Sequence, residues 1–265
     1  QADIHGNLLT RQRIQVLRAL LEREEVTIVT SIDSCLDCLV PLAVWKEKVI
    51  KIRNDSEIDL DRMKRHLVEL GYEWAAQVEV PGQFSIRGGI MDVFSLTEDN
   101  PWRIELWGDE VDSIRSFDAE SQRSIENLEE ISIYPACELV LTAEERQEGI
   151  KRILKEADKV SAKLRKEMKT EEAHRTKSAA AQIAEEAGEL GISAGLDAYL
   201  SYFCEERVSL LDYFNRENTV IFVDELARSI ERGMVTETEF SESMKQRLET
   251  VSYTHLRAHE TRGNL

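Results

Sequence analysis

The sequence predicts a mixed α/β chain in which a β-rich module is followed by a mostly helical stretch. Five of the twelve glycines and three of the four tryptophans lie between Gly71 and Gly108. The last of the four prolines is Pro135. Because glycine favours turns and proline interrupts helices, we expect a β-rich module over 71–141 and helices in the Pro-free remainder.

The first 70 residues carry both helical and strand patterns. Apolar residues at helical spacing predict a helix over 11–21. Short runs of apolar, β-branched residues predict buried strands over 26–30 and 49–52. Asp59 is then expected to cap a helix that ends at Gly71, a residue type that readily adopts the backbone conformation found just beyond a helix.

Alternating apolar and polar residues predict the strands of the module. The expected strands are 83–87, 90–94, 103–107, 111–117 and 131–134. Between the first two, Gly88 and Gly89 indicate a bulge or a close approach of two backbones. Side chains alternate along a strand, so Arg103, Glu105 and Trp107 are expected to share one face.

The pattern becomes helical from Thr142, where the sequence Thr-Ala-Glu-Glu is a capping box. The stretch that follows, to about Gly188, is rich in Glu, Lys and Ala. Its charges are most simply a solvated helix face, and a helical scaffold or coiled coil over 144–187 is the alternative. Residues 219–223 are predicted to form a further buried strand.

The last residues differ in composition from the rest. An unfinished helix over 239–249 is followed by 251–265, which has no apolar stripe and resembles translated adapter or vector sequence. We therefore expect a non-native tail, and we do not assign a metal site to His255 and His259. The chain starts at Gln1 rather than Met, which is expected of a fragment.

The composition of the chain argues against several classes of function. The 265 residues carry a net charge of −17, which repels phosphate and argues against strong binding of nucleic acid by this chain alone. No apolar run approaches the length of a membrane span. Only four cysteines occur, which predicts a reduced, cytoplasmic setting. Cys35 and Cys38 form a CxxC pair, which we interpret as buried thiols, with a redox or metal role as the alternative.

No catalytic site is evident. Asp224 and Glu225 follow an apolar run, as the acidic residues of a nucleotide-binding strand do, but the phosphate-binding motif GxxxxGK[ST] does not occur in the sequence. The five histidines are scattered and suggest no triad. We therefore assign no catalytic residue, no metal ligand and no cofactor to this chain.

The module itself carries a stronger signal. Residues 71–141 contain 15 acidic residues, four arginines and no lysine, so their net charge is −11. Arginine and tryptophan are enriched where proteins bind one another, and Arg103 and Trp107 lie on the polar side of one strand. They either form a docking surface, or Arg103 pairs with local carboxylates while Trp107 covers a sheet edge.

Two long motifs resemble the transcription-repair coupling factor family (Mfd). The first is QVEVPGQFSIRGGIMDVF, from Gln77 to Phe94. The second is RIELWGDEVDSIRSFD, from Arg103 to Asp118, and is followed by SQRS. The resemblance covers about 8–250. It implies a degenerate, helicase-like α/β domain formed by 1–70 and 142–250, which is expected to be incomplete, with the β-rich α+β module inserted between them.

In this family the module docks onto the repair protein UvrA. The docking residues are an Arg before the Gly pair, an Arg that opens the next strand, and an aromatic residue four positions on. Carried over to this sequence, they are Arg87, Arg103 and Trp107. The family's aromatic residue is commonly Phe, so Trp107 departs from the pattern.

The resemblance also implies a full-length parent that is an ATP-driven, magnesium-dependent DNA translocase acting on stalled RNA polymerase in nucleotide excision repair. The parts that bind ATP, polymerase and DNA would lie outside this sequence, which would recruit UvrA without chemistry of its own. The alternative is UvrB, a nucleotide-dependent excision nuclease subunit that shares the module. UvrB usually has Gly-Asp where this chain has Gly88-Gly89, which favours the coupling factor.

Overall fold

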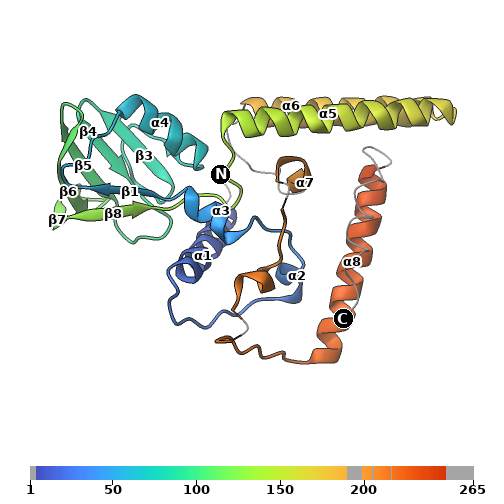
Figure 1. Ribbon diagram of the computed structural model, residues 1–265, viewed down its shortest axis with the longest axis horizontal. Helices are drawn as coiled ribbons and strands as arrows, with labels where there is room; N and C mark the ends of the chain where they lie inside the picture. Colours follow the sequence, from blue (N-terminus) through green and yellow to red (C-terminus); the bar gives the residue numbers. More distant parts are fainter. Residues whose placement is uncertain (1–3, 190–198, 205, 216, 249–265) are drawn as a thin grey trace.

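The computed structural model describes residues 4–189, 199–204, 206–215 and 217–248 and has a mixed α/β architecture (Figure 1). Its elements are, in order, α1 (Ile4–Leu21), α2 (Ile32–Cys35), α3 (Leu42–Glu47), β1 (Ile50–Arg53), α4 (Leu60–Glu69), β2 (Glu73–Trp74), β3 (Gln83–Arg87), β4 (Ile90–Val93), β5 (Trp102–Trp107), β6 (Glu110–Phe117), β7 (Ser124–Leu128), β8 (Glu130–Ile133), α5 (Ala143–Lys166), α6 (Thr170–Glu189), α7 (Leu200–Phe203), the 3₁₀ helix η2 (Leu210–Tyr213) and α8 (Leu226–Leu248).

Six strands form the main sheet, in the order β2-β3-β4-β5-β6-β7. All neighbours are antiparallel except β2 and β3. A separate two-stranded ribbon pairs β1 with β8, and its register places Ile50 opposite Ile133 and Ile52 opposite Ile131. The β-module therefore begins and ends on neighbouring strands, although some 80 residues of sequence separate them.

One face of the main sheet is apolar and forms the core of the module. Cross-strand partners Phe84, Val93 and Trp102 lie in one row, and Met91 and Ile104 lie in the next. All five are buried, together with Ile52, Leu67 and Ile133 from the ribbon and α4. The core cluster thus includes residues that precede Gly71. The division of the chain into 1–70 with 142–250 and an insertion at 71–141 stays a prediction.

Local sequence signals place the ends of two helices. The side chain of Asp59 accepts a hydrogen bond from Arg62 N at 2.9 Å and caps α4. Gly71 follows that helix with a φ of +87°, where a side chain would also crowd Cys137. Thr142 and Glu145 form the predicted capping box at the start of α5. These three predictions are confirmed.

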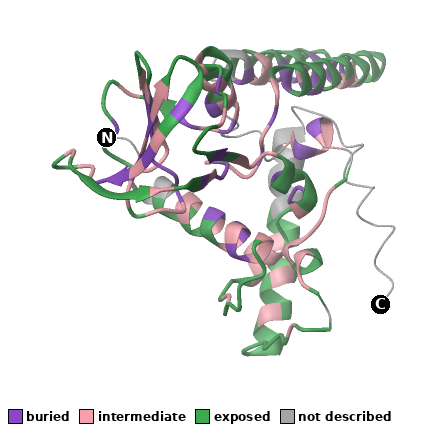
Figure 2. Cartoon of the chain, turned by 60° about the vertical axis from the view of Figure 1, so that its left-hand side comes forward, coloured by how far each residue is buried: buried purple, intermediate pink, exposed green. Residues whose placement is uncertain are grey.

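Helices α5 and α6 form a long antiparallel hairpin that extends away from the sheets (Figure 1). Buried residues follow the line where the two helices meet, and the outer surfaces are exposed (Figure 2). Buried alanines at positions 157, 173 and 180 allow this close packing. The charged residues therefore form a solvated face, as the sequence indicates. Near the base of the hairpin, Phe203 of α7 packs against Gly149.

Two predicted strands are wrong. Residues 26–30 and 219–223 do not form strands, and most of their apolar side chains are exposed, reaching 93% for Val29 and 91% for Phe222. A buried strand needs neighbours that pair with its backbone and cover both faces, and no described residue supplies them here. The tail 251–265, with His255 and His259, lies outside the described residues.

The described ranges contain several long helices, most of them rich in charged residues. Among these helices, none is both long and apolar enough to cross a bilayer.

We predict that Gly149→Ala destabilises the chain by about 1–3 kcal/mol, because the added Cβ would lie 2.1 Å from the ring of Phe203. Gly233→Ala in α8 is the matched control. Its Cβ would meet nothing closer than 3.5 Å, so the gain in helix propensity should stabilise by up to about 1 kcal/mol. Urea unfolding of both variants measures the difference, and effects of the same sign would contradict this packing.

We predict that the two turn glycines between β3 and β4 tolerate different substitutions. A Cβ on Gly89 would lie 2.8 Å from the carbonyl oxygen of Leu106, so Gly89→Ala should cost about 1–3 kcal/mol. Gly88 has a φ of +60° and open space around it, and asparagine adopts this conformation readily. Gly88→Asn should therefore cost less than about 1 kcal/mol in thermal unfolding. Equal losses would argue against the close backbone approach.

Candidate protein-docking surface

The face of the main sheet opposite the core is polar at its centre. Cross-strand pairing places Ser85, Asp92, Arg103 and Arg115 in one row across β3, β4, β5 and β6. Because alternate residues point to opposite faces, this row lies behind the apolar row that contains Val93 and Trp102. The strand register therefore gathers polar residues that are up to 30 positions apart in sequence.

A buried carboxylate organises this face. The side chain of Asp92 is 1% exposed and accepts three hydrogen bonds from arginine. Arg103 donates two of them, from Nε at 2.7 Å and from Nη2 at 2.8 Å, which is the bidentate geometry of a strong ion pair. Arg87 donates the third from Nη2 at 2.9 Å.

Arg103 is held on every side. Its Nη2 also donates to the side-chain oxygen of Gln122 at 3.1 Å, and its guanidinium lies 4.4 Å from the centre of the Phe117 ring. Hydrogen bonding to Asp92 raises the pKa of Arg103 above its ordinary value, although burial opposes the shift. Only 16% of the side chain is exposed. Arg103 therefore exposes little surface to a partner protein, and its contacts are with Asp92, Gln122 and Phe117 of the module itself.

Arg87 and Trp107 are the residues that this face presents outward. Half of the Arg87 side chain is exposed, and Trp107 is 85% exposed. Their two hairpins are joined where Leu106 N donates to the carbonyl of Gly89 at 2.7 Å. The predicted close approach at the glycine pair is thus confirmed, between the turn that leads into β4 and the end of β5. An exposed tryptophan and a half-exposed arginine on one face are suitable anchors for a protein partner.

The three residues predicted from the sequence thus belong to one face, but they differ in environment. Arg103 pairs with the local carboxylate of Asp92, which agrees with the purely structural alternative for this residue. Trp107 is too exposed to cover a sheet edge, which that alternative also required. The sequence analysis missed Asp92, Gln122 and Phe117. Asp92 could have been found, because it is a charged residue between the apolar Met91 and Val93 on a strand. The role of these residues in binding stays a prediction.

Asp224 and Glu225 follow an exposed segment that is not a strand, and Glu225 forms an ion pair with Arg228 at 2.9 Å. Without a phosphate-binding loop in the sequence, these residues do not fit ATP and magnesium.

The CxxC pair differs from its prediction. Cys38 is exposed, so the interpretation as two buried thiols is wrong for this residue, because it lies in a loop after α2 rather than beside a strand. Cys35 is partly buried, and burial together with the charge of Asp37 raises the pKa of its thiol. Over the described ranges, no group of three or more His, Cys, Asp or Glu residues is arranged to hold a metal ion.

The module matches a known protein family, and most of the chain is similar to known DNA-repair proteins. Residues 50–139 match the family described as the UvrB interaction domain. The chain is 38% identical over 247 residues to the transcription-repair-coupling factor of Bacillus subtilis, which covers 93% of this chain and 21% of the relative. The corresponding protein of Staphylococcus haemolyticus is 32% identical over 253 residues, covering 91% of the chain and 20% of the relative.

The UvrABC system protein B of Thermosipho africanus is also similar. It is 31% identical over 229 residues, which cover 84% of this chain and 34% of the relative. The chain thus spans about a fifth to a third of the length of these relatives. The resemblance expected from the two sequence motifs is confirmed: residues 50–139 match the UvrB interaction domain, within a chain that is similar over most of its length to transcription-repair-coupling factors.

Proposed function

We propose that this chain is the adaptor region of a transcription-repair coupling factor and that the polar face of its module recruits UvrA in nucleotide excision repair. The observation that carries the proposal is that the exposed Trp107 and the half-exposed Arg87 lie on the same face of the sheet, where Arg87 is paired with the buried Asp92. The matches to the UvrB interaction domain and to coupling factors support it. Catalysis by this chain is not part of the proposal.

The parent protein is proposed to be an ATP-driven, cytoplasmic DNA translocase that acts on stalled RNA polymerase. ATP, magnesium, polymerase and DNA would be bound by parts that this chain does not contain. Residues 1–70 and 142–250 would contribute to a degenerate helicase-like domain. The higher identity to a coupling factor and the lack of GxxxxGK[ST] in this sequence favour this proposal over a UvrB-type nuclease subunit.

We predict that Trp107→Ala and Arg87→Ala each weaken binding to purified UvrA by about thirtyfold, which corresponds to about 2 kcal/mol for a hot-spot residue. The expected cause is loss of the exposed indole in one case and of the half-exposed guanidinium in the other. Isothermal titration calorimetry with the 1–265 chain measures both affinities.

Matched controls come from the same module. Trp74 is 57% exposed on β2, and Arg123 is exposed in the loop before β7. Trp74→Ala and Arg123→Ala should change the affinity for UvrA by less than about threefold. If wild type binds but Trp107→Ala is as neutral as Trp74→Ala, UvrA recruitment stands and this surface is wrong. If well-folded wild type does not bind, the recruitment proposal fails.

We predict that Asp92→Ala lowers the free energy of unfolding by about 3 kcal/mol, because it leaves the enclosed guanidinium of Arg103 without its counter-ion. Asp112, which is exposed on β6, provides the control, and Asp112→Ala should stay within about 0.5 kcal/mol of wild type. Urea unfolding checks both values. A small loss for Asp92→Ala, with Arg103→Ala equally mild, would show that the pair does not organise the face.

A further inference from the structure

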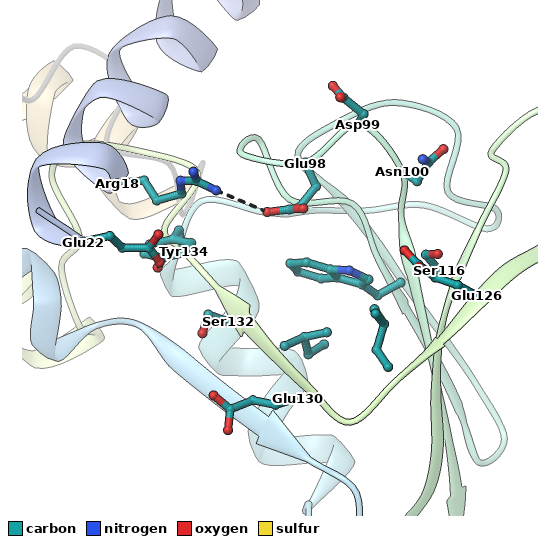
Figure 3. A pocket seen from close by; sticks show the side chains of 13 residues that line it. Arg18, Glu22, Glu98, Asp99, Asn100, Ser116, Glu126, Glu130, Ser132 and Tyr134 are labelled. Atoms are coloured by element: carbon teal, nitrogen blue, oxygen red, sulfur yellow. Dashed lines mark hydrogen bonds and ion pairs between the residues drawn. The ribbon is translucent and has the colours of Figure 1, made fainter. Parts of the chain in front are cut away.

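One part of the chain has a net charge of opposite sign to the rest. Residues 151–177, the distal part of the α5–α6 hairpin, contain ten Lys or Arg and five Asp or Glu, a net charge of +5 in a chain whose total is −17. Acidic residues gather elsewhere, and five of them line the pocket between α1 and the main sheet that Figure 3 shows: Glu22, Glu98, Asp99, Glu126 and Glu130. Residues 151–177 therefore form a basic arm on an acidic protein.

Lysines of α5 form a stripe along one side of the basic arm. The members of this lysine stripe are Lys155, Lys159, Lys163 and Lys166, and all four are exposed. Their spacing of four, four and three residues keeps them within an arc of about 80° around the helix and spreads them over about 16 Å of its length. The buried side of α5, which includes Ile153 and Ala157, packs against α6. The stripe therefore lies on the opposite, solvent-facing side.

Most of the charge of the lysine stripe is not balanced by carboxylates. Lys159 pairs with Glu156 at 3.0 Å, but among the residues that the structure describes the other three lysines have no ion-pair partner. The partial negative charge at the C-terminal end of α5 favours Lys163 and Lys166. That effect fades within the last turn, so it does not account for Lys155 and Lys159. The stripe thus presents a line of cations that the fold does not require.

We infer that the lysine stripe binds the phosphate backbone of duplex DNA. Each strand of a duplex carries one phosphate per about 3.4 Å of its axis, so a straight stripe of about 16 Å can contact several phosphates of one strand. Residues 151–177 contain no Phe, Trp or Tyr on which the bases of a single strand would stack. The partly exposed Leu154 lies on another side of the helix. The stripe therefore lacks the large apolar anchors of a protein interface.

The overall negative charge of the chain weakens this contact without abolishing it. Charges more than about 10 Å apart are largely screened at 0.1 M salt, and the hairpin extends away from the acidic module (Figure 1). The contact is additional to the DNA-binding parts proposed for the parent protein. It is also independent of UvrA recruitment, because it uses a different part of the chain.

The test measures binding of a fluorescein-labelled duplex of about 20 base pairs to the 1–265 chain by fluorescence anisotropy. At about 50 mM NaCl we expect a Kd of roughly 10⁻⁴ M, and a slope of about −3 for the logarithm of the association constant against the logarithm of the salt concentration. A single strand of the same length should bind at least about threefold more weakly, because it offers neither base stacking nor a rigid phosphate line. Labelled poly-glutamate, which represents an acidic protein, should also bind at least about threefold more weakly.

Charge-matched variants locate the contact. The double variant Lys155→Gln/Lys163→Gln and its control Lys51→Gln/Lys64→Gln each remove two exposed lysines, so their net charges are equal. The stripe variant should bind the duplex about tenfold more weakly and lose about 2 from the steepness of the salt slope, whereas the control should change by less than about twofold. Thermal unfolding confirms that both variants are folded.

Three results would overturn the inference. The first is no measurable binding of the duplex by wild type at about 50 mM NaCl. The second is an equal loss of affinity in the two double variants, which would place the contact elsewhere. The third is binding of the single strand or of poly-glutamate as tight as that of the duplex, which would assign the stripe to that ligand instead.

Discussion

The pairing of β1 with β8 is the constraint on which the rest of the module depends. It joins residues 50–53 to residues 130–133 and buries Ile52, Ile131 and Ile133 against the inner face of the main sheet. Because that face is covered by the ribbon and by α4, the opposite face is left to carry the charged row. Closing the module therefore sets which face of the main sheet can carry charged residues.

The charged row uses a buried polar group to stabilise the fold. On the outer face, Asp92 accepts hydrogen bonds from Arg87 and Arg103, so its charge is balanced although it is buried. A buried polar network with all its partners in place stabilises one arrangement of the strands. The same outer face carries the exposed Trp107.

Outside the module, helix α1 anchors to it through specific contacts. Arg11 donates to the carbonyls of Leu96 and Glu98, and Arg13 pairs with Glu138. The rings of Trp45 and Tyr134 stack at 5.9 Å between their centres beside this helix. In contrast, residues 26–30, 219–223 and the first turns of α8 expose many apolar side chains. The well-packed part of the described structure is thus the module with α1 and the hairpin base.

Local chemistry by itself determined several elements of this protein. The caps at Asp59 and Thr142, the turn at Gly71 and the strand alternation around Arg103 depend on residues a few positions apart, so they can be predicted without a tertiary structure. The same alternation, with the family resemblance, indicated that Arg103 and Trp107 share a face.

Only the tertiary structure decided which charges meet and which apolar runs become strands. Asp92 and Arg103 are partners because β4 and β5 pair in one register, and a shift by one residue would separate them. Residues 26–30 and 219–223 have strand-like composition, yet they do not form strands. A strand is stabilised by neighbours that pair with it, and those contacts are not encoded within the run itself.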